Sequence, residues 1–363
     1  METESHFVSD LPIPPGEYLE EVVEELGISK GELATRMGRP LPKLSAIFSG
    51  KKAITPDTAL QLERVTGVGA HIWTGLENDY RLSQARRRAR ERETQCKAET
   101  PLVTKFCYRQ LVVLGLVPQF TRGIDKVKAM QEFFGVMSLH SVLDVPRYQV
   151  AHRHGAREVG DRSPEAVAAW LRVGEVKARA KDCAPFDGQA LKSGLAKLRG
   201  LTSQAPETFS YQLEQALSES GVAFVPCPHF PKTKAHGATF FQSKDRAVVM
   251  LSLRYKWGDI FWFTLFHELG HLLLHSKKDV ILEDKEKTIR EEEADVFARD
   301  QLIPAEDWTA FTSQPRYTSN RIREFASQTG ISAGIVVGRL QHEKRILPSA
   351  HNELRQRYQF AQK

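Results

Sequence analysis

Apolar residues recur at helical spacing through the first eighty residues of the chain, and short polar signals separate one stripe from the next. Ser29 followed by Glu32 is the signature of a capping box at the start of a second helix. A third helix is expected at about 41–48, and Thr55 followed by Pro56 begins a fourth, because proline is favoured at the first helical position. This part of the chain is therefore predicted to be a bundle of short helices.

The pattern changes in the rest of the chain, where helical stripes alternate with two β-rich runs that turn residues flank. The expected elements are strands at 222–226 and 247–251 and helices at about 207–218, 259–275 and 287–303. The expected regions are a helical N-terminal domain at 1–80, a basic linker or helix extension at 81–100, a helical middle region at 101–205, a mixed core at 206–318 and a helical C-terminal extension at 319–363. The predicted fold class is α+β, mostly α, with a small sheet.

Composition places the chain among ordinary soluble globular proteins. Its 363 residues exceed what one compact domain usually holds, and 41% of them are hydrophobic while 26% are charged. The four cysteines are scattered without a CxxC pair, so reduced thiols are expected rather than a disulfide framework. No apolar run approaches the roughly 20 residues of a membrane span, and the polar N-terminus lacks a signal core. We therefore expect a cytoplasmic protein without membrane contact.

Charge along the chain is unevenly distributed. The net charge is +6 and the pI is about 9.0, an excess that alone only weakly favours an acidic partner. A dense basic run, Arg-Arg-Arg-Ala-Arg at 86–90, follows the predicted helical bundle. Two interpretations fit this run equally well: a solvated linker, or an arm that contacts phosphates.

The clearest chemical signal is the run His267-Glu268-Leu269-Gly270-His271 inside a predicted helix. Residues four apart on a helix lie on one face about 6 Å from each other, so His267 and His271 can hold one ion. Neutral imidazole is a good Zn²⁺ ligand. Glu268 can hold a zinc-bound water, take its proton and pass that proton to a leaving amine. The competing interpretation is a buried histidine pair that is hydrogen-bonded in the core. Burying two histidines and a glutamate costs several kcal/mol unless they are paired or metal-bound, and a carboxylate-rich helix follows at a usable distance, which favours the metal site.

The third zinc ligand is expected to be an acidic residue of the next helix, since no third histidine stands at the spacing that follows some HExxH motifs. That helix contains the run Glu291-Glu292-Glu293-Ala294-Asp295. Its predicted buried face consists of Ala294, Phe297, Ala298 and Gln301. Glu293 borders this face one turn before Phe297 and is our prediction for the third ligand, although Glu292 is not excluded.

These motifs, followed by Leu302-Ile303-Pro304, resemble the ImmA/IrrE family of metallopeptidases. The resemblance covers about 206–347 and includes Gly237-Ala238-Thr239-Phe240 and the stretch from Leu251 to Thr264. It implies a zincin-like fold, Zn²⁺ ligands at His267, His271 and Glu293, and Glu268 as general base. It also implies a bacterial or phage regulator that cleaves repressors or antitoxin-like proteins. The resemblance carries over no residue that stabilises the transition state, for which Tyr255, His236 and His275 are candidates.

The N-terminal bundle resembles the HigA-like branch of the XRE-type helix-turn-helix regulators. The resemblance rests on the stretches 15–19, 27–29, 32–34 and 50–55. It implies a DNA-binding domain.

A helix that begins at Leu41 can enter a major groove with its N-terminal residues at the base edges. Lys43 and Ser45 are the expected base or phosphate contacts, and the expected phosphate contacts are Arg39, Lys51 and Lys52. Pro40 and Pro42 crowd the start of this helix, which leaves open that the domain serves mainly for dimerisation or protein contact.

Taken together, these observations predict a DNA-binding transcriptional regulator that is also a zinc metalloendopeptidase. Its predicted partners are operator-type DNA and one protein substrate, such as a repressor, a toxin or the chain itself, and a homodimer is compatible with such an operator. The alternative is an antitoxin or repressor of a toxin–antitoxin system whose metallopeptidase fold is a sensor with little proteolysis. The intact Glu268 favours the enzyme, because a site that only binds does not require a base.

Overall fold

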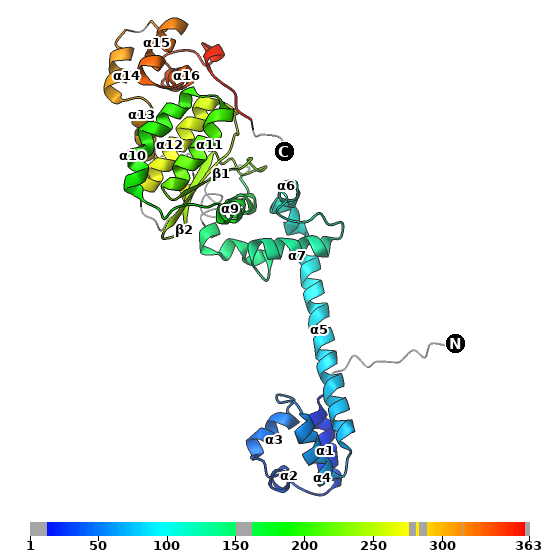
Figure 1. Ribbon diagram of the computed structural model, residues 1–363. Coiled ribbons are helices and arrows are strands. Elements are labelled where there is room, and N and C mark those ends of the chain that lie inside the picture. The colour runs from blue at the N-terminus through cyan, green and yellow to red at the C-terminus, as the bar shows by residue number, and fades with distance from the viewer. Residues whose placement is uncertain (1–12, 150–161, 276–280, 283–288, 315, 360–363) are drawn as a thin grey trace. The chain divides into compact units, whose positions relative to one another are not determined.

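The computed structural model describes residues 13–149, 162–275, 281–282, 289–314 and 316–359 (Figure 1). It divides the chain into two compact units, one ending at Ala98 and the other starting at Glu99. The fold class is confirmed: the chain is mostly helical with one small sheet. Among the described residues, no helix combines the length and the apolar character that crossing a lipid bilayer requires.

The first unit is a bundle of helices, as the sequence predicts. Its elements are α1 (Pro15–Glu25), α2 (Lys30–Arg36), α3 (Leu41–Phe48), α4 (Pro56–Thr66) and the start of α5 (Ala70–Lys105). The expected caps form, since the Ser29 side chain accepts a hydrogen bond from the backbone amide of Glu32 and Thr55 accepts one from Thr58. The fully buried core includes Leu19, Leu33, Leu44, Leu62 and Trp73.

Residues 81–100, predicted as a linker or helix extension, are helical throughout because they lie inside α5. The side chains of this stretch are mostly exposed, and Arg87 pairs with Glu91 one turn later. Near the C-terminal end of α5, several side chains become buried. There the buried Glu99 accepts hydrogen bonds from the side chains of Ser138 and Gln131 and from the backbone amide of Leu139.

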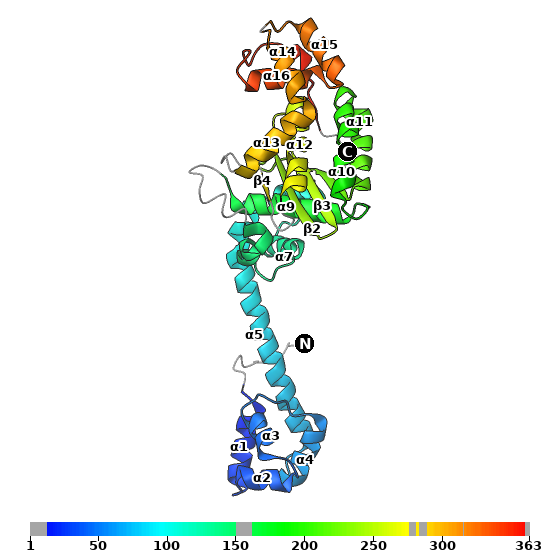
Figure 2. The same cartoon turned by 90° about the vertical axis from the view of Figure 1, so that its left-hand side faces the viewer.

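The second unit contains a four-stranded sheet of order β1-β3-β2-β4. Figure 2 labels three of its strands, β2, β3 and β4. The strands are β1 (Val222–Pro226), β2 (Gly237–Ser243), β3 (Arg246–Leu251) and β4 (Ile281–Leu282). β1 pairs parallel with β3, whereas β2 pairs antiparallel with both β3 and β4. The sequence predicts β1 and β3 from their apolar runs, but β2 and β4 are not among the predicted elements.

The other described elements of this unit are helices. They are α6 (Tyr108–Val113), α7 (Gly123–Phe134), η1 (Leu139–Asp144), α9 (Pro164–Arg179), α10 (Gly188–Gly200), η2 (Leu201–Ser203), α11 (Pro206–Glu219), α12 (Gly258–Leu274), α13 (Ile289–Leu302), α14 (Ala305–Thr312), α15 (Ser319–Thr329), α16 (Ala333–His342) and η3 (Asn352–Leu354). Of these, α9, α11 and α12 pack against strands of the sheet. The central helix α12, yellow in Figure 1, packs against α13, α16, β2 and β3. Its fully buried Trp262, Leu265, Phe266 and Leu269 belong to the main core.

The C-terminal residues fasten the start of α12. The guanidinium of Arg355 donates to both carboxylate oxygens of Asp259, at 3.0 and 2.8 Å. The indole of Trp262 donates to the hydroxyl of Tyr358 at 3.1 Å, and Trp257 forms a β-bridge with Arg357. These contacts fix the N-terminal end of α12, and with it the helix that carries the His-Glu-x-x-His run.

Candidate metal centre

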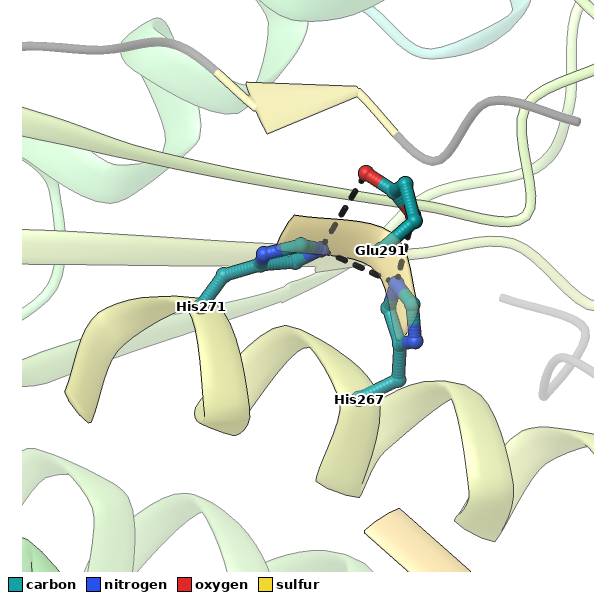
Figure 3. Close-up of side chains that lie close together, drawn as sticks. All are labelled: His267, His271 and Glu291. Carbon is teal, nitrogen blue, oxygen red and sulfur yellow. Dashed lines mark hydrogen bonds and ion pairs between the residues drawn. The ribbon is translucent and has the colours of Figure 1, made fainter. Parts of the chain in front are cut away.

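Helix α12 places His267 and His271 on one face, as their four-residue spacing predicts. Both histidines are buried, and their Nε2 atoms lie 2.9 Å apart (Figure 3). Buried apolar residues of the main core occupy the other sides of this part of α12. Two neutral imidazoles that turn the same nitrogen toward one point are suited to share a cation.

Glu291, at the start of α13, completes the cluster. Its Oε2 lies 3.1 Å from Nε2 of His267 and its Oε1 lies 3.5 Å from Nε2 of His271 (Figure 3). One ligand atom from each of the three residues lies within 4.8 Å of the others, which makes this a group that can hold a metal ion. The Glu291 side chain is only 12% exposed, so its charge is directed into the protein.

Glu293, the third ligand expected from the sequence, points elsewhere. Its side chain is 54% exposed, and its carboxylate lies 3.0 Å from Nε2 of His275. Glu292, the other residue considered, is exposed as well. The structure therefore brings Glu291, rather than either of these two, to the histidine pair. Glu291 is the functional candidate that the sequence prediction missed.

The spacing along α13 contains the signal that could have found Glu291. The buried residues of α13 are Glu291, Ala294, Ala298 and Leu302, separated by three or four positions. This is the regular stripe of a helix packed on one side. Phe297 and Gln301, which the predicted face included, are only half-buried. Extending the stripe backwards from Ala294 by three residues leads to Glu291.

The second ring nitrogen of each histidine also has a partner. Nδ1 of His267 lies 2.9 Å from a carboxylate oxygen of Asp295, and Nδ1 of His271 lies 3.0 Å from Nδ1 of His275. His275 in turn contacts Glu293. Metal-binding histidines usually have such outer partners, which fix the tautomer and the orientation of the ring. Glu293 thus takes part in the centre through His275.

Electrostatics favour the protonation states that metal binding needs. Burial lowers the pKa of His271 below its usual range, although hydrogen bonding to Glu291 opposes this effect. Burial alone would raise the pKa of Glu291, but hydrogen bonds from His267 and His271 hold it at about 2. A neutral imidazole and an ionised carboxylate are the ligand forms of these groups.

Glu268 belongs to α12, and its fully buried side chain contacts β2. Its Oε2 accepts a hydrogen bond from the hydroxyl of Thr239 at 2.5 Å. A Cβ at Gly237 would lie 2.3 Å from the other oxygen, Oε1, so glycine is required to leave room for this carboxylate. The helix thus presents the His pair and the acid between them on adjacent faces, with β2 holding the acid.

The donor set fits zinc. Two histidine nitrogens and one carboxylate are a combination that zinc takes in catalytic sites, where a fourth position remains for water or substrate. The outer partners of both rings are a further feature of such sites. Three residues were candidates for stabilising a transition state. His275 contacts Nδ1 of His271. The rings of His236 and Tyr255 pack on each other, with their centroids 5.1 Å apart.

The residues expected to contact DNA lie on or next to α3. Lys43 and Ser45 are exposed on the helix, and Lys51 and Lys52 are exposed in the turn that follows it. Arg39 precedes the helix and donates to the side-chain oxygen of Gln61 at 2.6 Å. Two prolines stand at the N-terminal end of α3, yet the helix forms from Leu41 because neither position requires a donor inside the helix.

Comparison with known proteins matches both parts of the chain. The IrrE N-terminal-like domain, a peptidase family domain of the M78 group, matches residues 231–341, and a helix-turn-helix domain matches residues 19–73. The uncharacterized HTH-type transcriptional regulator YddM of Escherichia coli (strain K12) is 34% identical over 71 residues, which are 20% of this chain and 76% of that protein.

Two solved structures each match about a fifth of the chain. An addiction module antidote protein of the HigA family from Coxiella burnetii is 33% identical and covers 22% of this chain and 88% of its own, with a TM-score of 0.21. A putative antidote protein of a plasmid maintenance system from Nostoc punctiforme PCC 73102 is 28% identical with the same coverages and TM-score. Both resemblances predicted from the sequence are confirmed by the two matched domains. The chain therefore belongs to the helix-turn-helix transcriptional regulators, and it also carries an IrrE N-terminal-like domain of the M78 peptidases.

Proposed function

We propose that this regulator is also a zinc-dependent endopeptidase that cleaves one specific regulatory protein. The observation that carries the proposal is the meeting of His267, His271 and Glu291, whose ligand atoms lie within 4.8 Å of one another. A structural role for this cluster would leave the neighbouring Glu268 without purpose, because a buried carboxylate is costly in a core. Its presence beside the ligands favours hydrolysis.

In this proposal His267, His271 and Glu291 hold the zinc ion. When bound, zinc polarises a carbonyl group and lowers the pKa of a bound water. Glu268 takes the proton from the attacking water and delivers it to the leaving amine. The hydroxyl of Thr239 orients the Glu268 carboxylate for both transfers. Asp295 and His275 keep the two imidazoles in the orientation that the ion requires.

The helix-turn-helix domain directs the peptidase to its place of action. We propose that α3 contacts operator DNA through Lys43 and Ser45, while Arg39, Lys51 and Lys52 lie at phosphates. A protein bound at the same operator is then present at a high effective concentration. This second filter supports selective cleavage of a repressor or antitoxin-like partner over general digestion.

Cleavage of the chain itself between residues 81 and 100 is less favoured than cleavage of a partner. A peptidase cleft takes an extended strand or an unfolded loop. Residues 81–100 are helical within α5, so this segment must unwind before it can be cut.

The proposal is tested by comparing the wild type with Glu268→Gln. Each zinc-loaded protein is incubated alone, with casein and with the products of the neighbouring genes, and cut sites are mapped by mass spectrometry. We expect the wild type to cut one neighbouring regulator at defined bonds, casein slowly, and Glu268→Gln to cut neither, because an amide cannot accept the proton. Equal cutting by both proteins would exclude Glu268 from the mechanism. Rapid Glu268-dependent digestion of casein would contradict a dedicated substrate.

A further inference from the structure

A cavity of about 280 Å³ lies beside the metal centre, within the second unit. Its apolar wall consists of Ile260, Phe263, Leu302, Ile303 and Ile335, which belong to α12, α13, the residue after α13, and α16. Cavities that bind whole small molecules measure roughly 300–1,000 Å³. The volume is therefore small for a cofactor and suits one large side chain.

The position of the cavity connects it to the first metal ligand. Ile260, Phe263 and Thr264 line the cavity and precede His267 by seven, four and three residues, so they lie on the same face of α12. Asp295 lines the cavity as well and is hydrogen-bonded to His267. A peptide whose scissile bond lies at the metal thus has this cavity next to it.

Several of the charged groups around the cavity already have partners. Asp259 is paired with Arg355 through both oxygens. Arg339 pairs with Glu343 at 3.0 Å and also donates to the carbonyl oxygens of Arg299 and Ile303. These groups build the wall of the cavity, and a ligand would have to displace protein contacts to use them.

Two basic side chains at the cavity are different. Within the described ranges, the side chains of Arg299 and His342 form no hydrogen bond or ion pair with the protein. Arg299 is half-buried at the wall, and His342 is exposed at the end of α16. An arginine without a partner beside an apolar cavity provides a site for a carboxylate.

We propose that this cavity is the specificity pocket of the peptidase. It takes one aliphatic or aromatic side chain of the protein substrate next to the scissile bond, while Arg299, helped by His342, binds the carboxylate of an adjacent Asp or Glu. The inference rests on the proposed function, since it names the substrate sequence that the metal centre acts on. It is tested by binding, so that it can fail independently of proteolysis.

The test selects random heptapeptides on the zinc-loaded full-length Glu268→Gln chain and measures the affinity of the selected peptides. We expect them to share a Leu, Ile or Phe beside an Asp or Glu. Filling the cavity by Ile260→Trp should weaken their binding about tenfold or more, whereas Ile260→Val should change it little. Arg299→Glu should select a basic neighbour in place of the acidic one, and Arg299→Gln should select neither.

Exposed Arg323 on α15 provides the matched control, because Arg323→Glu changes the same charge away from the cavity and should leave the selected sequences unchanged. Thermal unfolding of each variant verifies that it is folded. The proposal is overturned if no shared sequence emerges, or if Ile260→Trp and the Arg299 variants select the same peptides as their parent. If the shared sequence appears but the wild type never cuts it, the pocket stands and the proposed proteolysis fails. If the wild type cuts its partner at sites that lack the apolar and acidic pair, the proposed proteolysis stands and the specificity pocket fails.

Discussion

At the scale of single residues, each of the two histidines of α12 is held at both ring nitrogens. Nε2 of His267 faces the cluster, while its Nδ1 is bonded to Asp295 at 2.9 Å. Such an acceptor takes the Nδ1 proton, so that Nε2 can release its own proton when an ion binds, and it makes that nitrogen a stronger ligand. The orientation of the ring is thus determined before any ion arrives.

The first prediction concerns this outer partner. Asp295→Asn should keep the three ligands but weaken zinc binding by about 10- to 100-fold. The neutral amide oxygen accepts the Nδ1 hydrogen bond of His267 more weakly than the charged carboxylate does. The affinity is measured by competition with a chromophoric chelator at neutral pH. Asp300→Asn, an exposed change on the same helix, is the control. Equal affinities of the two variants would show that Asp295 does not orient His267.

Glu99 is a second buried acid whose protonation state the fold determines. Burial alone would raise its pKa, but hydrogen bonds from Leu139, Ser138 and Gln131 outweigh this effect and lower the pKa below its usual range. A carboxylate with a lowered pKa stabilises the folded state above the pKa of the unfolded chain, and this contribution is lost as the pH falls.

The second prediction follows from the lowered pKa of Glu99. Glu99→Gln should destabilise the second unit by about 1–3 kcal/mol at neutral pH, because buried donors lose a charged acceptor. The difference from the wild type should shrink as the pH falls below 4.5, the ordinary pKa of the group. Thermal unfolding followed across this pH range measures it. A difference that stays constant with pH would mean that the charge of Glu99 contributes nothing.

At the scale of elements, the sequence predicts helix α12 correctly but predicts the buried face of α13 only in part. A run of apolar residues with two histidines predicts a buried helix, and α12 is one. On α13 the predicted and observed faces share Ala294 and Ala298. The observed face also contains Glu291 and Leu302 in place of the predicted Phe297 and Gln301. Hydrophobic patterning assigns a glutamate to solvent, and Glu291 breaks this rule because its carboxylate faces the two histidines of α12.

The central strand shows a different limit. β2 contains Gly237, Thr239 and Gln242 and lacks the long β-rich run that predicts β1 and β3. It becomes a strand because β3 on one side and β4 on the other satisfy its backbone groups. Such pairing depends on residues distant in sequence, which local patterns do not reveal.

The third prediction concerns the packing of α1 on α3. A Cβ at Gly16 would lie 2.2 Å from the carbonyl oxygen of Phe48, so Gly16→Ala must push the two helices apart. Overpacking of this kind costs about 1–3 kcal/mol. Hydrogen exchange of peptides from residues 13–66 should accelerate, while those of the second unit should not change.

Gly31→Ala is the matched control for this change. Its Cβ would meet only the Ser29 hydroxyl oxygen at 3.7 Å, an ordinary contact. Alanine is a better helix former than glycine by about 1 kcal/mol, so exchange should slow or stay constant. Acceleration by Gly31→Ala and not by Gly16→Ala would contradict the packing described for α1 and α3.

At the scale of the whole molecule, two matched domains occupy the two compact units of one chain. Both domain types were recognisable from the sequence because each depends on a compact local motif. The His-Glu-x-x-His run and the capped short helices need no long-range information. The finer division of the chain at residues 205 and 318 stays a prediction.

The fourth prediction concerns DNA. The full-length chain should bind its own promoter region, and binding should weaken as salt rises because phosphate contacts release counterions. Lys43→Ala should reduce sequence preference, whereas removing the charges of Arg86, Arg87 and Arg88 should weaken binding to all sequences alike. Titration of labelled promoter and scrambled DNA at several salt concentrations measures both effects. Absence of binding at low salt would favour a protein-contact role for the bundle.

The zinc content of the purified chain tests the central claim most directly, because the proposed hydrolysis depends on the metal. Elemental analysis should find about one zinc per chain in the wild type, as expected for a site with three protein ligands. His267→Ala, His271→Ala and Glu291→Ala should each lose most of it, while Glu293→Ala should retain most of it because Glu293 contacts His275 instead. A wild type without zinc, or full zinc in the Glu291 and His267 variants, would contradict the account.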